Sequence, residues 1–180
     1  MRTTPDGKYL YAANEVMDYD GGETVFSKDG KLANDGSITS YSIDQATGKL
    51  TKINQVSSGG GAACHISVNR AGTQLVCSNY MGGNVSLFNI ENDGSLSPNS
   101  QVKFANKGGP NKARQEASHP HSANFVNPSW SRDQYVHIPD LGNDQTHMLS
   151  FDGDNKLVNT IAPIEAASGS GPRHLTYDSK

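Results

Sequence analysis

Ionisable side chains crowd into one stretch of this chain, residues 114–122, which reads RQEASHPHS. The stretch places a guanidinium (Arg114), a carboxylate (Glu116) and two imidazoles (His119 and His121) directly before a short apolar run. Imidazole exchanges protons near neutral pH, and a guanidinium binds carboxylate or phosphate through a planar array of donors. These residue types therefore indicate acid–base chemistry on a small anionic molecule.

Two other stretches also place a histidine at the start of a strand-like run. His65 precedes one such run, and Arg173 and His174 precede another. The numbering separates His65 from His121 by 56 positions and His121 from His174 by 53. This spacing predicts a fold that brings equivalent loops to one common centre.

The elements that must hold these residues are short strands joined by turns. Apolar residues make up 34% and aromatic residues 7% of the 180 residues, and there are 19 glycines, a profile typical of a turn-rich β protein. Turn signals such as Pro5-Asp6-Gly7 and Gly82-Gly83 each come directly before a run that favours a strand. No ten-residue window repeats apolar residues with a helical period.

The predicted strands recur in units of similar make-up. They cover residues 8–14, 36–44, 47–53 (with a turn), 65–68, 74–79, 84–90, 125–126, 135–140 and 146–152, and a further unit begins at His174. The glycine-rich, charged stretch 18–34 is predicted to be a long surface loop. A unit of about 50–60 residues with three or four strands is the signature of a β-propeller. The sequence therefore predicts an all-β propeller of four-stranded blades, a single partial domain over residues 1–180 with about three and a half blades.

Charge and hydropathy exclude several classes of protein. The net charge of −3 provides no basic face, so no nucleic-acid partner is expected. No apolar run approaches 18 residues and no apolar signal segment opens the chain, so we expect no membrane span and a cytoplasmic location. Cys64 and Cys77 are too few for a disulfide framework and are predicted to be buried thiols.

Four motifs carry a family resemblance. They are residues 79–86 (NYMGGNVS), 114–121 (RQEASHPH), 139–144 (PDLGND) and 169–174 (GSGPRH). In this order they resemble the seven-bladed β-propeller lactonase family, which includes the propeller-type 6-phosphogluconolactonases and the fungal carboxy-cis,cis-muconate cyclases. The resemblance runs from about Pro5 to the last residue. It implies an incomplete copy of a seven-bladed ring.

The resemblance also implies where the site lies. It places an active cleft on one face of the ring, near the central channel. His121 matches the catalytic histidine of the family, and Arg173 matches an arginine that binds the anionic group of the substrate. The family's other partners, a glutamate and a second arginine, belong to later blades. Gln145 departs from the family pattern, which commonly has arginine after the aspartate of the third motif.

Opening a lactone needs a base that activates water and a cation that binds the anionic group of the substrate. We expect His121 to be the base and Arg173 to bind the anion. Candidate substrate-binding residues are His65, Arg114, Glu116, His119, Asp140 and His174. No cofactor is expected, and a metal site of His65, His119 and His121 is not favoured because no carboxylate ligand accompanies them.

Structural roles are the alternative for several of these residues. Arg173 could form a salt bridge between blades to Asp140, and Arg114 could pair with Glu116. Asp140 follows a strand-like run and could equally cap the turn that comes next.

The leading hypothesis is a hydrolase that opens a sugar lactone, first of all 6-phosphogluconolactone. One alternative is a lactonising isomerase similar to the muconate cyclases, since both reactions need an arginine for an anionic group. The other alternative is a non-catalytic interaction module or an inactive fragment, because a propeller fold by itself decides no function. The partner expected for either enzyme is a small anionic lactone or carboxylate, and the sequence leaves the oligomeric state open.

Overall fold

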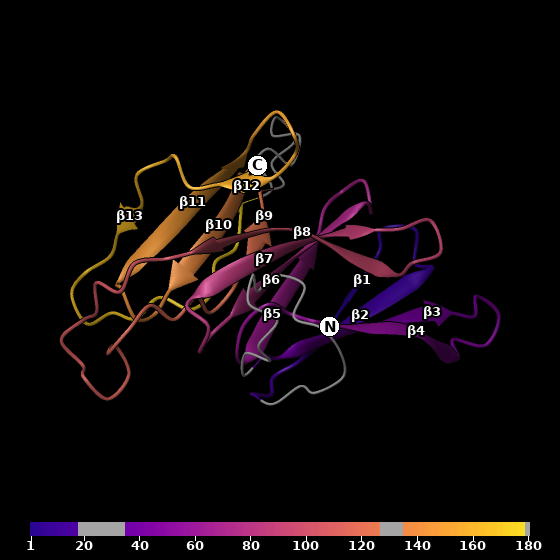
Figure 1. The fold of residues 1–180 in the computed structure, drawn as a ribbon, viewed down its shortest axis with the longest axis horizontal. Helices are drawn as coiled ribbons and strands as arrows, with labels where there is room; N and C mark the ends of the chain where they lie inside the picture. Colours follow the sequence, from indigo (N-terminus) through magenta and orange to yellow (C-terminus); the bar gives the residue numbers. More distant parts are fainter. Residues whose placement is uncertain (18–34, 127–134, 179–180) are drawn as a thin grey trace, which may run out of the picture.

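The protein is an assembly of antiparallel sheets. A computed structural model describes residues 1–17, 35–126 and 135–178, and within those ranges it contains strands and turns without a helix. Three sheets stand side by side, the first in indigo and purple, the second in magenta and the third in orange (Figure 1). The surface loop predicted over 18–34 lies outside the described residues.

Each sheet is built from strands in sequence order. The first sheet contains β1 (Arg2–Thr3), β2 (Tyr9–Asn14), β3 (Ser37–Ile43) and β4 (Leu50–Ser57). The second contains β5 (Ala63–Val68), β6 (Gln74–Asn79), β7 (Asn84–Ile90) and β8 (Leu96–Lys103). The third contains β9 (Asn124–Phe125), β10 (Tyr135–Asp140), β11 (Gln145–Phe151) and β12 (Leu157–Val158), and β13 (Ile164–Glu165) pairs with the other end of β11.

The three sheets stack as blades do. β5 contacts both β1 and β9, while β8 contacts both β4 and β12, so first strands neighbour first strands and last strands neighbour last strands. Such stacking of four-stranded antiparallel meanders is the architecture of a propeller. The predicted fold class is thereby confirmed.

Two apolar cores fill the spaces between the sheets. On β6, Leu75 and Cys77 pack toward the first sheet, whereas Val76 packs toward the third. Because both faces of the second sheet are covered, every residue of β6 is buried. Cys77 is thus a buried thiol as predicted, whereas Cys64 is only partly buried, and both are free cysteines.

Several strands have no clear signal in the sequence. β8 is largely polar and contains Pro98, which an outermost strand tolerates because the missing N–H faces no ladder partner. The register of β8 against β7 also shifts between Leu87 and Phe88. β1, β12 and β13 have two residues each, too few to show a period of two. The unit predicted to begin at His174 forms no strand within the described residues.

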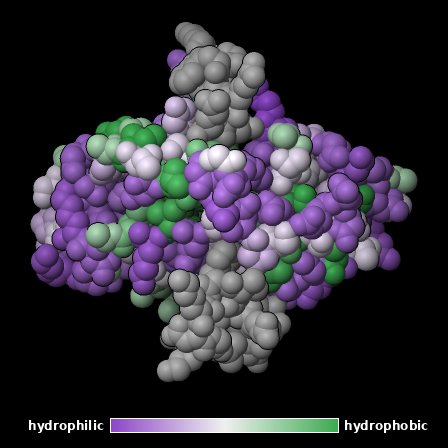
Figure 2. All heavy atoms as spheres, turned by 45° about the horizontal axis from the view of Figure 1, so that its top comes forward, coloured by the Kyte–Doolittle hydropathy of each residue, from purple (hydrophilic) through white to green (hydrophobic). Residues whose placement is uncertain are grey.

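The visible surface is mostly polar. In Figure 2 hydrophilic atoms cover most of the face, with small hydrophobic groups between them. The large apolar side chains that are exposed are scattered along the chain: Met1, Val16, Met17, Leu50, Met81 and Ile164. Among the described residues there is no helix with the length and apolar character needed to cross a membrane.

The packing between blades leads to a stability prediction. Leu87 is 0% exposed between the second and third sheets, whereas Leu50 is 44% exposed at the start of β4. Leu87→Ala should lower the free energy of unfolding by about 2–5 kcal/mol, since it removes buried methyl groups and leaves a cavity. Leu50→Ala should cost less than about 0.5 kcal/mol. Urea titration of both variants measures the difference, and equal costs would contradict the described packing.

Candidate active site

The segment that carries two neighbouring histidines is held against the end of β10. The N–H of His121 donates to the carbonyl of Pro139 over 2.9 Å, and the N–H of Leu141 donates to the carbonyl of His119 over 3.0 Å. These two bonds continue the antiparallel pairing of the third sheet past β9. The backbone of both histidines therefore has a fixed position relative to the blade.

Asp140, at the end of β10, anchors this segment from inside the protein. Its carboxylate is 0% exposed. It accepts hydrogen bonds from the N–H groups of His119, Gly142 and Asn143, the hydroxyl of Ser118, the side-chain amide of Asn143 and Nε2 of His147. Burial alone would raise the pKa of Asp140, but the bonds from His147, Ser118 and the N–H of His119 hold it below its usual value.

The buried position of Asp140 gives it no surface to offer a substrate. The sequence predicts that Asp140 binds substrate, with the capping of a turn as the alternative role. The structure shows the capping arrangement, since Asp140 accepts from the turn N–H groups of Gly142 and Asn143. Arg173 is not among its partners, so the salt bridge considered between them is not formed.

Asp144, four residues after Asp140, anchors the segment that carries Arg173. Its carboxylate accepts the N–H of Gly169 over 2.6 Å, the N–H of Gly171 over 2.8 Å and the side-chain amide of Gln115 over 2.7 Å. Burial would raise the pKa of Asp144, and the two glycine N–H groups together with Gln115 lower it below its usual value. The bonds tie the glycine loop that precedes Arg173 to the third sheet.

Three histidines from distant parts of the chain meet in space. The ring centroids of His121 and His174 are 4.9 Å apart with an interplanar angle of 85°, and those of His65 and His174 are 6.2 Å apart. The convergence expected from their spacing in the sequence is therefore present. No cluster of three or more histidine, cysteine, aspartate or glutamate side chains in the described ranges could hold a metal ion.

His121 has the properties of a proton acceptor. Burial lowers its pKa, and electrostatic interactions with His174, Arg173 and Arg114 lower it further. Its buried Nδ1 has no hydrogen-bond partner among the residues that the structure describes. Buried polar atoms without a partner are uncommon in folded proteins, and they are often found where function requires them.

His65 is neutral in the same cluster. Its Nδ1 accepts the N–H of Ala123 over 3.3 Å, which leaves the ring proton on Nε2. Burial, followed by the charges of Arg2 and His174, lowers the pKa of His65 to about 4. The ring can therefore donate one hydrogen bond at neutral pH without carrying a charge.

The two arginines line one depression of about 250 Å³. Its walls are formed by Asn111, Arg114, Gln115, Leu141, Gly169, Ser170, Gly171 and Arg173. Within residues 1–17, 35–126 and 135–178 neither arginine forms an ion pair. The pairing of Arg114 with Glu116 considered above is thus absent, because Glu116 bonds His119 instead.

His119 does not line this depression. Its side chain is buried, with Nε2 lying 2.8 Å from Oε1 of Glu116 and Nδ1 lying 2.9 Å from the carbonyl oxygen of Tyr80. Both ring nitrogens are therefore occupied by protein acceptors. His119 and Glu116 form a pair beside the site, and their predicted contact with a substrate stays a prediction.

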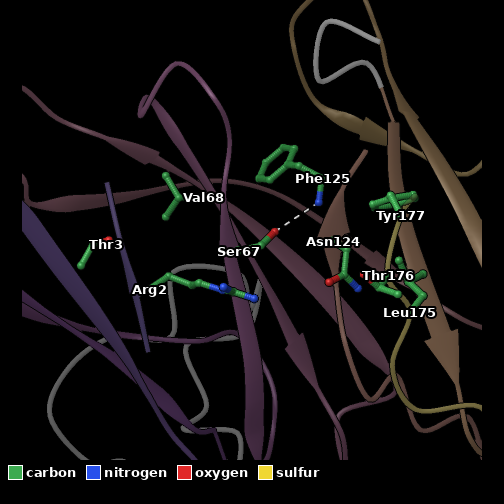
Figure 3. A pocket seen from close by; sticks show the side chains of 9 residues that line it. All are labelled: Arg2, Thr3, Ser67, Val68, Asn124, Phe125, Leu175, Thr176 and Tyr177. Carbon is green, nitrogen blue, oxygen red and sulfur yellow. Dashed lines mark hydrogen bonds between the residues drawn. The ribbon is translucent and has the colours of Figure 1, made fainter. Parts of the chain in front are cut away.

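A second depression of about 380 Å³ runs along the innermost strands. Figure 3 shows Arg2 of β1 extending toward Ser67 of β5 and Asn124 of β9, with the N–H of Phe125 bonded to Ser67. Residues 175–177 of the last segment line the same space. The first strand of each blade thus contributes to one common depression, and the three-histidine cluster lies beside it.

Sequence reasoning missed three residues that organise the site. Tyr80, Gln115 and Asp144 were given no role, although each belongs to one of the four motifs. The signal for Asp144 was its place in a turn between two strands, where a carboxylate commonly caps backbone N–H groups. Gln145, the departure from the family pattern, donates its side-chain amide to Glu165 over 2.6 Å.

Comparison with known proteins identifies the family of the chain. Residues 1–180 match the model of a family described as lactonase, 7-bladed β-propeller. The chain belongs to this lactonase family. The resemblance read from the four motifs is thereby confirmed.

Relatives within the lactonase family are about twice as long. The chain is 29% identical over 180 residues to the 6-phosphogluconolactonase of Formosa agariphila, covering 98% of this chain and 46% of the relative. It is 34% identical over 152 residues to the 6-phosphogluconolactonase of Bacillus subtilis, covering 83% and 41%. The solved periplasmic gluconolactonase of Pseudomonas aeruginosa superposes with a TM-score of 0.75 at 30% identity, covering 97% and 46%.

The buried carboxylate at the end of β10 gives this lactonase-family chain a testable pH dependence. Asp140→Asn should lower the free energy of unfolding by about 3 kcal/mol at pH 7, because an amide NH₂ group then faces donors that need an acceptor. Since the pKa of Asp140 is depressed in the folded state, its contribution is complete above the unfolded value of about 4 and is lost as the pH falls through the folded value.

Denaturant unfolding from pH 7 to pH 2 measures this contribution. The stability difference between wild type and Asp140→Asn should shrink below about pH 4. Asp154→Asn, in an exposed turn, is the matched control and should change stability by less than about 0.5 kcal/mol. A difference between wild type and Asp140→Asn that stays constant over this range would contradict the depressed pKa.

Proposed function

We propose that this chain carries part of the active site of a lactone hydrolase that opens 6-phosphogluconolactone, with His121 as the base and Arg173 as the anion ligand. The observation that carries the proposal is the ring contact of His121 with His174, next to the depression lined by Arg114 and Arg173, whose charges act on His121. The names of the curated relatives favour lactone opening over lactone closure. The chain spans less than half of these relatives' length.

In the proposed reaction His121 takes a proton from water as the water oxygen attacks the lactone carbonyl carbon. The neutral imidazole is the required form, and burial and nearby positive charge favour it. The bond between the carbonyl carbon and the ring oxygen then breaks, and the ring oxygen takes up the proton that His121 holds. The product is an open-chain hydroxy acid, and the imidazole returns to its neutral state.

Arg173 and Arg114 supply the positive charge in this proposal. A guanidinium presents several N–H donors in a plane and stays protonated throughout the reaction. Because neither arginine has an ion-pair partner within the described residues, neither must exchange a protein carboxylate for the substrate anion. His65 can donate one further hydrogen bond from Nε2, for example to the developing oxyanion.

Hydrolysis of freshly prepared 6-phosphogluconolactone tests the assignment. His121→Ala should lower kcat/KM by about 100-fold or more, since it removes the base. Arg173→Ala should mainly raise KM, by about tenfold or more, since it removes a charged contact to the anion. Arg70→Ala, in the turn after β5, is the matched control and should keep the wild-type constants.

The measured rates need correction for spontaneous ring opening, and the Bacillus subtilis relative serves as the positive control. The value of kcat/KM should fall on the acid side with a midpoint below the ordinary histidine pKa of about 6.5, because His121 must be neutral. Wild-type turnover at the spontaneous rate, or full activity of His121→Ala, would refute the proposal.

A further inference from the structure

Tyr80 contacts two of the groups that the proposed reaction uses, His121 and Arg114. It directly follows β6, and its ring stacks on His119 with centroids 4.4 Å apart and planes 10° apart. The same ring meets the imidazole of His121 at 90°, with centroids 5.7 Å apart. The Tyr80 hydroxyl lies 3.5 Å from Nη2 of Arg114, which donates to it. One side chain thus contacts both the expected base and one of the cations.

The backbone and the stacked partner fix the plane of this ring. The N–H of Tyr80 donates to the carbonyl of Ala62 over 2.9 Å, and its own carbonyl faces Nδ1 of His119 at 2.9 Å. His119 is 2% exposed, and its second nitrogen bonds Glu116 at 2.8 Å. With both imidazole nitrogens engaged, the His119 ring cannot turn, and the tyrosine stacked on it is held in one orientation.

We propose that Tyr80 is a positioning residue whose ring sets the plane of His121 and whose hydroxyl holds Arg114, with the His119–Glu116 pair fixing Tyr80 itself. This inference rests on the proposed function for what the two positioned groups do. It gives His119 a reason to lie buried next to the depression without lining it, with Glu116 bonded to it from the surface. It also connects the second sheet, which carries Tyr80, with the stretch before β9, which carries Arg114 and His121, at the place proposed to bind the substrate.

Removal of the ring should change the titration of His121 in a defined direction. The titratable and charged groups that surround His121 are His174 and Arg173 from the last segment, Arg114 from the turn at 111–114, Tyr80 from the β6–β7 turn, and the Cys64 thiol, which donates to the His121 carbonyl. Burial and these cations lower the pKa of His121. Loss of the Tyr80 ring admits water and frees Arg114 to move away, and both effects raise the pKa toward its usual value.

Tyr80→Phe isolates the hydroxyl, because it keeps the stack on His119 and the edge contact with His121. The expected result is a rise in KM of about threefold or more with kcat within about twofold, since only the hold on Arg114 is lost. Tyr9→Phe is the matched control, since it removes a hydroxyl that donates to the Asn92 carbonyl in another part of the protein. It should leave both constants unchanged.

Tyr80→Leu removes the ring as well. The expected result is a fall in kcat of about tenfold or more together with an upward shift of the acid limb of the pH profile. His119→Gln should move both quantities in the same direction, because glutamine offers no ring for the stack. This second variant keeps the test decisive where Tyr80→Leu fails to fold.

Two readouts judge Tyr80 without turnover. One is the titration midpoint of the His121 imidazole followed by NMR, and the other is the affinity for 6-phosphogluconate measured by NMR titration. We expect a raised midpoint in Tyr80→Leu and about threefold weaker binding in Tyr80→Phe. An unmoved midpoint or unchanged binding overturns the inference. A wild-type chain that opens no lactone refutes the proposed function alone, because these two readouts still decide the role of Tyr80.

Discussion

Two buried carboxylates four residues apart, Asp140 and Asp144, hold the candidate site together. A carboxylate in the protein interior is stable only when donors replace its lost hydration, and both side chains recruit those donors from other segments. Asp140 draws in the histidine-bearing segment through Ser118 and His119, and Asp144 draws in the glycine loop before Arg173. The cost of burying charge is thus offset by bonds that assemble the site.

The conformation of the turn between Asp140 and Asp144 allows both carboxylates to reach these segments. A Cβ on Gly142 would overlap the carbonyl oxygen of Ala117, so only glycine allows the histidine-bearing segment to lie so close. Asp144 adopts a φ of 53°, a left-handed conformation that non-glycine residues rarely take and that aspartate tolerates better than most. Backbone strain at one residue therefore serves to direct a carboxylate at two N–H groups of another segment.

The sequence predicted the fold well because blades repeat local signals. β6 and β7 carry apolar residues on both faces, and turn residues separate them, so they were visible without the structure. β8 could not be recognised in the sequence, because it is largely polar and contains Pro98. It is an outer strand whose stability comes from the ladder with β7.

The residue types in the sequence predicted which side chains gather at the site, but not the hydrogen-bond partner of each one. Histidines at repeated positions indicated convergence, and His65, His121 and His174 do converge. No local pattern tells which donor reaches a buried carboxylate from another blade. The sequence therefore left open a salt bridge between Asp140 and Arg173. In the structure the ring that bonds Asp140 is His147 on the neighbouring strand.

The electrostatics of the site differ from those of the whole chain. The net charge is −3, yet Arg114, Arg173 and Arg2 all lie near the histidine cluster. Burial, together with Arg173 and Arg114, lowers the pKa of His121 and so favours the neutral form that a base needs, while Arg2 acts on His65. In the proposed reaction, an anion bound to Arg173 cancels part of the positive field, so the pKa of His121 rises once the substrate is bound. In this proposal the same arginines bind the anion and strengthen the base at the moment when it must accept a proton.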